Sequence, residues 1–364
     1  MDFHSTRAFK LWQRYEHHLG LGALVVGFIF DLILAKRPDS IADNTLLLSY
    51  LFIAGATIII LNLRQVRRME AQLAYEPFLL LLILQFCFGG LASNLLVLYG
   101  KSGTLAVSAI FVGLLVAMVL GNEYVRTRYS LLRLNVAVYY FLLLTYFVLS
   151  VPTFVVHSVG ALPFLLSVFL SLVCIALFLS ILWRAVLRGH ARALREVSLI
   201  VAIIASSFTG LYFLNVIPPV PLSLKDIGVY HSLLRTGEGS YIATYEPAAW
   251  WQFWLDTSSI AHVSAGESLY CFSSVFAPTG LEAPIYHRWE HYDPQSGQWQ
   301  TRLYLSFPIS GGRSDGYRGY STLSSLDGGD WRCSVETSTG ALIGRESFSV
   351  EPAPPAPVLS TATL

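Results

Sequence analysis

The segment Asn215-Val216-Ile217-Pro218-Pro219-Val220-Pro221 divides the sequence into two parts of different character. Three prolines within four residues cannot continue a helix and favour a stiff, extended spacer. Long apolar runs precede this segment, whereas short alternating stretches with charges of both signs follow it. We therefore expect a membrane-embedded helical part before the prolines and a water-exposed β-rich part after them.

The overall composition supports a membrane protein. Of the 364 residues, 54% are hydrophobic and only 13% are charged, against about 25% charged residues in an average soluble domain. The formal net charge of +1 leaves no excess of Lys and Arg to neutralise phosphates, which argues against a nucleic-acid partner. The four cysteines lack CxxC spacing, so we expect neither a metal site nor a cofactor.

Seven apolar runs are long enough, or nearly so, to cross a hydrocarbon core of about 30 Å. They are residues 19–35, 45–63, 77–99, 105–120, 134–151, 161–183 and 197–216. Arginines follow the second, fourth and sixth runs, while the intervening loops hold few positive charges. By the positive-inside rule, the N-terminus lies in the cytoplasm and the residues after the seventh run lie outside. The prediction is an α-helical polytopic bundle of about seven transmembrane helices.

Few polar side chains interrupt these runs, and the ones we single out are Asp31, Gln85 and Asn94. A transporter usually has ionisable residues at depth that face a cavity. Asp31 lies about 18 Å along its run at 1.5 Å per residue, which favours a position near the outer interface. An interfacial or helix-pairing role is preferred over an ion or proton role. A transport function requires the three side chains to converge on one interior cavity.

The expected domain organisation has five parts. They are a cytoplasmic N-terminal segment (1–18), a seven-span transmembrane domain (19–217), a proline linker with an aromatic membrane-proximal segment (218–267), an extracytoplasmic β-sandwich domain (268–350) and a disordered, proline-rich tail (351–364). Short alternating segments separated by turn signals, such as Asp293-Pro294 and Gly311-Gly312, predict an all-β antiparallel sandwich in the fourth part.

Three indole rings gather in the linker region, at Trp250, Trp251 and Trp254. Indole rings favour the headgroup region of a bilayer, where the ring is buried and its N–H stays wet. One interpretation places this segment on the outer leaflet or on the outer ends of the helices. The other, equally weighted, is that the rings belong to the core of the β-rich domain.

Several short motifs of the C-terminal part together resemble a known family. They begin at Cys271-Phe272-Ser273, His287-Arg288-Trp289, Gly311-Gly312-Arg313, Trp331-Arg332-Cys333 and Gly344-Arg345. In combination they are similar to the bacterial domain-of-unknown-function family 2914, a C-terminal domain usually found after a multi-span membrane region. The resemblance covers roughly the last third of the chain. It implies a fold and a location, the inner membrane with the domain in the periplasm, but no activity and no catalytic residues.

The candidate ligand-binding residues are arginines, aromatic residues and their polar neighbours: His287, Trp289, Arg313, Asp315, Arg318, Tyr320, Trp331 and Arg332. The guanidinium fork of Arg suits carboxylate or phosphate, and Trp or Tyr faces suit sugars and cations. In the preferred alternative, Arg313 and Arg318 pair with Asp315, Glu290 or Glu336. Trp289 and Trp331 then fill the sandwich core.

Cys271 and Cys333 are the two cysteines of the β-rich part. In an oxidising compartment they could form a disulfide between strands. Two buried, inert thiols are an equally weighted alternative. Catalysis by one of these thiols with His287 or His291 is the least favoured.

Together these observations favour a non-enzymatic integral inner-membrane protein whose periplasmic β-domain binds an envelope partner or ligand, in assembly or sensing. The partner classes are an envelope protein, a lipid headgroup or a glycan, besides the bilayer itself. One alternative is a transporter or channel for a small solute or lipid. The other is an envelope-modifying enzyme, which requires a cleft where His287 or an arginine cluster meets a perturbed acid or thiol.

Overall fold

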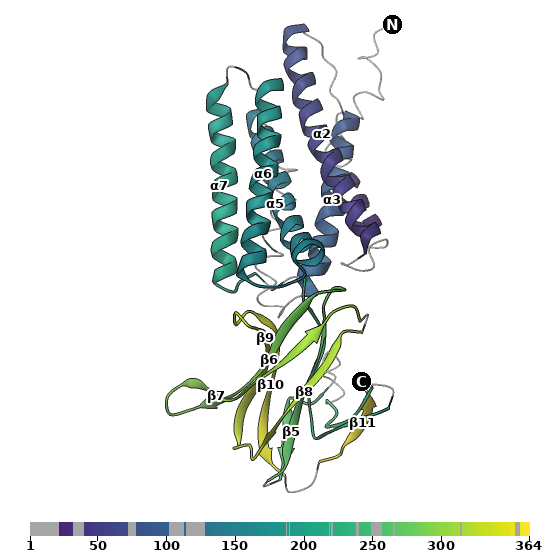
Figure 1. Ribbon diagram of the computed structural model, residues 1–364, viewed down its shortest axis with the longest axis vertical. Helices are drawn as coiled ribbons and strands as arrows, with labels where there is room; N and C mark the ends of the chain where they lie inside the picture. The colour runs from purple at the N-terminus through teal and green to yellow at the C-terminus, as the bar shows by residue number, and fades with distance from the viewer. Residues whose placement is uncertain are drawn as a thin grey trace, which may run out of the picture. The chain divides into compact units, whose positions relative to one another are not determined.

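The computed structural model describes residues 22–31, 40–71, 78–101, 113 and 128–364, the last range without residues 187, 189, 218, 220, 238–239, 249–256, 265, 314 and 354–356. The chain forms two compact units (Figure 1). One is helical and ends at Ile217, and the other contains His157–Gly160 and Pro218–Leu364.

The helical unit contains long, apolar helices. Their bounds are α2 Ile41–Ala71, α3 Phe78–Lys101, α5 Arg128–Ser150, α6 Ala161–Ala185 and α7 Ala191–Phe213, with a π-helical turn η2 at Val151–Val156. By length and composition, four described segments could cross a membrane: Ile41–Arg64, Leu132–Val156, Ala161–Ala185 and Ala191–Phe213. Side chains such as Phe169 and Leu177 of α6 are exposed, which is the pattern of a helix that is apolar on all sides.

The expected count of seven spans is not supported. Besides the four long segments, the described residues contain the shorter apolar helices Gly22–Asp31 and Leu79–Ser93. Of the predicted run 105–120, only Gly113 is among the described residues. What holds is the coarser prediction that apolar helices precede a β-rich region.

Helix α5 packs against α2, α6 and α7 (Figure 1). Polar contacts join it to two of these helices. The hydroxyl of Tyr146 donates to Asn44 Oδ1 of α2 at 2.8 Å, and Tyr140 lies 3.5 Å from Ser171 of α6. In a bilayer core, where no water is available, such side-chain pairs would satisfy groups that are otherwise orphaned.

The second unit is built from three sheets. The first has the order β1-β5-β8, the second β4-β10-β9-β6-β7 and the third β11-β3-β2. The bounds are β1 Ser223–Tyr230, β2 Ser232–Arg235, β3 Tyr241–Tyr245, β4 Ile260–Val263, β5 Ser268–Phe276, β6 Glu282–Asp293, β7 Gln298–Ser310, β8 Tyr317–Ser324, β9 Gly329–Thr337, β10 Leu342–Pro352 and β11 Ser360–Thr363. Strand β4 pairs with β10 in parallel, so the expectation of a purely antiparallel domain is wrong at this pair.

The first two sheets enclose an apolar core. Their inward side chains alternate along each strand, and Val275 of β5 packs in one cluster with Ile285 of β6 and Val335 of β9. A disulfide joins Cys271 of β5 to Cys333 of β9. Trp331, two residues before Cys333, donates its indole N–H to the carbonyl of Asp327 at 2.7 Å. Trp289 of β6 is buried near the disulfide. The order of the strands in the two sheets, the disulfide between the sheets and this tryptophan match the layout of immunoglobulin-type sandwiches.

The third sheet covers the outer face of the first. Tyr230, Leu233, Tyr241 and Ala243 form an apolar cluster with Phe272 of β5. The strands of the β-rich unit begin with β1 at Ser223, well before the expected domain boundary at residue 268. The expectation of a disordered tail is also wrong where the tail is described, because β11 pairs with β3 and Leu364 packs against the same cluster.

Candidate ligand-binding face

The structure separates the eight predicted ligand-binding residues into three places. His287, Trp289 and Trp331 are buried between the first two sheets. Arg313 and Asp315 lie in the loop that leads into β8, and Arg318 and Tyr320 lie in the first half of β8 itself. Arg332 alone lies on the outer face of the five-stranded sheet. The predicted constellation is therefore not one site.

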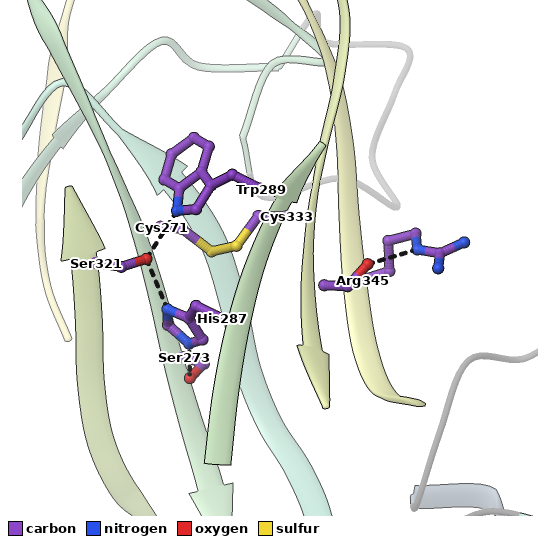
Figure 2. The surroundings of a disulfide bond; sticks show 8 residues. Cys271, Ser273, His287, Trp289, Ser321, Cys333 and Arg345 are labelled. Atoms are coloured by element: carbon purple, nitrogen blue, oxygen red, sulfur yellow. Dashed lines mark hydrogen bonds between the residues drawn. A yellow bond between two sulfur atoms is a disulfide. The ribbon is translucent and has the colours of Figure 1, made fainter. Parts of the chain in front are cut away.

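The interior group is a polar network between facing sheets. Ser273 of β5 lies 2.8 Å from Nε2 of His287, and Ser321 of β8 lies 2.9 Å from its Nδ1. Ser321 also accepts the indole N–H of Trp289 at 2.8 Å. Figure 2 shows these side chains following one another beside the disulfide. Burial lowers the pKa of His287 to about 4, so the imidazole is neutral near pH 7.

This interior offers little chemistry. The ligand atoms of Cys271, His287 and Cys333 lie within 4.8 Å of one another, a grouping that could hold a metal ion. In the disulfide, however, the two sulfur atoms are bonded to each other, and thiolate is the form that ligates metals or attacks substrates. All three residues are fully buried. The network is therefore structural.

The loop before β8 keeps its charges accessible. Arg313 and Asp315 are exposed, and the Arg313 guanidinium lies over the Tyr317 ring at 5.6 Å. Among the described residues, no ion pair joins Arg313 or Arg318 to Asp315, Glu290 or Glu336. The alternative that Arg313 and Arg318 pair with one of these three carboxylates is wrong. The loop is held instead by its backbone: Gly311 N–H donates to the carbonyl of Leu281, and Ser274 donates to that of Asp315.

A larger charged surface, which we call the arginine face, covers the outer side of the five-stranded sheet. It consists of Tyr286, Arg288 and Glu290 of β6, Trp299 and Tyr304 of β7, Arg332, Ser334 and Glu336 of β9, and Arg345 of β10. On β6 and β9 these residues alternate with the buried His287, Trp289, Cys333 and Val335, so they point outward.

The pairing register of β6, β9 and β10 places the residues of the arginine face side by side. Arg345 lies opposite Ser334, which lies opposite Arg288. In the next row Arg332 lies opposite Glu290, and its Nε is 2.6 Å from Glu290 Oε2. Directly opposed charges of unlike sign stabilise a strand pair.

Aromatic rings flank two of the three arginines. The Arg332 guanidinium lies over Trp299 at 4.2 Å, and that of Arg288 over Tyr304 at 5.2 Å. Arg288 Nη2 also forms an ion pair with Glu336 Oε2 at 2.9 Å. Tyr304 stacks on Tyr286 with ring centroids 4.9 Å apart. Planar guanidinium groups and rings thus form a preorganised polar surface.

The electrostatics of this face are not balanced. Glu290 and Glu336 are only 5% and 4% exposed, and burial raises the pKa of Glu336 despite the nearby Arg288. Arg345 donates its Nε–H to Ser334 Oγ at 2.8 Å, and no described carboxylate lies within ion-pair distance of it. Three guanidinium groups therefore share two carboxylates.

Of this face, only Arg332 belongs to the predicted ligand-binding set. Arg288 and Arg345 occur in the sequence prediction only within the family motifs, and Glu290 and Glu336 only as partners of Arg313 and Arg318. The alternation of polar residues at 286, 288 and 290 with apolar ones was visible. The pairing of these positions with residues 332, 334 and 336 depends on a register that the sequence does not show.

A second charged group links distant segments, and the sequence did not reveal it. His231 Nε2 lies 2.9 Å from Glu246 Oε1, and its Nδ1 lies 3.3 Å from Glu267. His262 Nδ1 lies 2.7 Å from the other Glu246 oxygen. Burial raises the pKa of Glu246. Hydrogen bonds from the His262 backbone N–H and from both imidazoles lower this pKa by more than burial raises it, so the net shift is downward.

The remaining predicted residues lie elsewhere. Asp31 and Gln85 are buried in the helical unit. The side chain of Asn94, and the residues Trp250, Trp251 and Trp254, fall outside the part of the chain that the structure describes.

Comparison with known proteins matches the C-terminal part of the chain to a family, and it gives no activity. Residues 282–350 match the family described as a protein of unknown function, DUF2914, as the motifs indicated. No curated protein matches the chain.

Several solved structures share a weak likeness. A β-glucosidase from Listeria innocua, in complex with gluconolactone, is 10% identical at a TM-score of 0.19, over 34% of this chain and 16% of that one. An immunoglobulin-like protein from Pseudomonas aeruginosa is 10% identical at 0.20, over 35% and 97%. The alkylpurine DNA glycosylase AlkC of Pseudomonas fluorescens, bound to DNA with an abasic site analogue, is 11% identical at 0.20, over 87% and 99%. Similarity this low supports no conclusion about this protein.

Proposed function

We propose that this chain, whose residues 282–350 match the DUF2914 family, is a non-enzymatic integral membrane protein of the inner membrane. In this proposal its β-rich unit lies in the periplasm and binds a cell-envelope ligand through the arginine face. The role is one of assembly or sensing.

The observation that carries the proposal is the contrast between two outer sheet faces. The third sheet covers the outer face of the first sheet with an apolar cluster around Phe272. The outer face of the five-stranded sheet instead presents three arginines and ring surfaces. Arginine and aromatic residues are the types enriched where proteins bind partners. The family match includes β6, β7 and β9 and most of β10, which supply every residue of this face.

Location is inferred from the helices and the cysteines. Four described helices are apolar enough to cross a bilayer, and the arginine-rich loops of the sequence favour an N-terminus in the cytoplasm. A disulfide between Cys271 and Cys333 is typical of an oxidising compartment such as the periplasm.

Transport is the second candidate function. Asp31 is fully buried in the helical unit and Gln85 is 3% exposed. Ionisable residues buried among membrane helices usually mark functional positions. An enzymatic role has less support, because the cysteines are bonded and His287 is sealed in the core.

Native mass spectrometry of the full-length protein, extracted from cells in membrane-derived polymer discs, tests the binding proposal. Tyr304 on the arginine face is 47% exposed, and Tyr320 of the first sheet is 41% exposed, so they offer a matched pair. We expect an envelope molecule to co-purify with the wild type and with Tyr320→Ala, and to be lost from Tyr304→Ala. Absence of any such molecule, or equal retention by both variants, would contradict the proposal.

A further inference from the structure

The arginine face contains one guanidinium group without an acidic partner. Arg332 is matched by Glu290 at 2.6 Å and Arg288 by Glu336 at 2.9 Å. Arg345 donates from Nε to the hydroxyl of Ser334, and no ion pair to it is present among the described side chains. The three arginines and two glutamates therefore leave one positive charge in excess.

The position of Arg345 suits the capture of an anion. It lies on β10 and Arg288 lies on β6, with the fully buried Ser334 of β9 directly between them. Adjacent strands are about 4.8 Å apart, so the two Cα atoms are separated by roughly 10 Å. Two guanidinium groups that flank a hydroxyl at this spacing can approach the same small anion. Figure 2 shows Arg345 pointing away from the disulfide and the sheet interior.

We propose that Arg345 anchors a singly charged oxyanion, the carboxylate or phosphodiester group of the envelope ligand, with Ser334 orienting its guanidinium. The inference rests on the proposed function of the arginine face and adds the chemical class of the ligand. One negative charge balances the excess, and the guanidinium fork binds such groups through two parallel N–H donors.

The electrostatic setting of Arg345 supports this assignment. Burial lowers the pKa of Arg345, and Arg332 and Arg288 lower it further, while Glu290 and Glu336 oppose them. A partly desolvated cation repelled by two neighbouring cations gains more from an added anion than an exposed arginine does. Tyr286 and Tyr304, stacked in the neighbouring part of the face, provide a flat surface for the uncharged part of the ligand.

Titration of the full-length protein in a neutral maltoside detergent, followed by saturation-transfer NMR, tests the inference. The probes are glucuronate, which carries a carboxylate, glycerophosphoglycerol, which carries a phosphodiester, and glucose as a neutral control. We expect at least one of the anions, but not glucose, to bind the wild type. Arg345→Gln should weaken that binding at least tenfold, and Arg345→Lys, which keeps the charge but not the fork, should weaken it less.

Arg235→Gln provides the matched control, because Arg235 is an exposed arginine of β2 away from this face. It should leave binding unchanged, and non-reducing mass analysis checks that each variant has formed the Cys271–Cys333 linkage. Binding of glucuronate identifies a sugar acid as the source of the anion, and binding of glycerophosphoglycerol identifies a phospholipid headgroup. Binding of neither anion, or binding that Arg345→Gln leaves intact, overturns the inference. The proposed function then still stands if Tyr304→Ala loses its co-purifying molecule, so the two failures are distinguishable.

Discussion

The hydroxyl of Ser321 lies 2.9 Å from Nδ1 of His287, so a serine of one sheet is bonded to a fully buried imidazole of the facing sheet. Ser321 also accepts the indole N–H of Trp289, and its own proton is then available to Nδ1, which leaves Nε2–H for Ser273. The neutral tautomer thus pairs both ring nitrogens of His287 and the indole N–H of Trp289. A protonated His287 would carry an unpaired charge in the core.

The stability of the β-rich unit should therefore depend on pH through His287. Its folded pKa of about 4 lies below the ordinary value of 6.5. The unfolded chain takes up the proton first, so stability is complete above pH 6.5 and falls as the pH decreases towards 4. The total loss is on the order of 3 kcal/mol. Pulse proteolysis between pH 7 and 4 measures this loss. His287→Gln should flatten this dependence and His291→Gln should not; an unchanged slope in His287→Gln would show that another group is responsible.

Removing the disulfide should destabilise the β-rich unit strongly. The two cysteines are 62 residues apart, and the loss of a cross-link closing a loop of this length costs about 4 kcal/mol in the chain-entropy treatment. The double variant Cys271→Ser, Cys333→Ser should lower the denaturant midpoint, whereas Cys174→Ser, at an exposed free cysteine, should not. Non-reducing mass mapping of protein isolated from cells should recover the cross-linked peptides. Recovery of both as free thiols would refute the bond.

Gly311 is required by a close backbone approach. A Cβ at this position would run into the carbonyl oxygen of Pro278, and the Gly311 N–H is bonded to the carbonyl of Leu281 at 2.8 Å. Gly311→Ala should cost about 2 kcal/mol, because backbone atoms cannot move aside as a flexible side chain can. Gly237→Ala, where nothing lies within 4 Å, is the control. Equal midpoints for the two variants would contradict the described loop.

Acid should loosen the segment around β4. Because the pKa of Glu246 is lowered from 4.5, its contribution to stability is present above that value and is lost as the pH falls through the lowered pKa. Hydrogen exchange of β4, taken relative to the intrinsic rate at each pH, should accelerate in this range. Glu246→Gln should accelerate it already at pH 7, since the variant loses the carboxylate that accepts from His262 and His231. Glu282→Gln, at an exposed glutamate, should have no effect; equal exchange in all three proteins would argue against the bonds at Glu246.

The broad division of the chain could be predicted from sequence, because Pro218 to Pro221 end a helix for local steric reasons and apolar runs report burial in lipid or core. The span count could not be read as reliably from hydropathy. The spacing of Cys271, Trp289 and Cys333, with Trp331 two residues before the second cysteine, is a sequence feature of the sandwich layout.

The candidate site was predicted poorly for a physical reason. Arg332 meets Glu290 42 residues away, and Arg345 meets Ser334 only through the β9–β10 register. A one-residue shift in either pairing would send the side chains to the opposite face. Residue types alone therefore grouped Trp289, Arg313 and Arg332, which the fold places in the core, in a loop and on the outer face.

The most direct test of the binding role uses a photo-crosslinking residue in intact cells. Ser347 is exposed and lies opposite Arg332, whereas Thr322 is exposed on β8 of the other sheet. The account predicts that a discrete lipid, glycan or protein adduct forms from position 347 and is absent from position 322. Adducts at both positions alike, or at neither, would contradict a ligand bound on the arginine face.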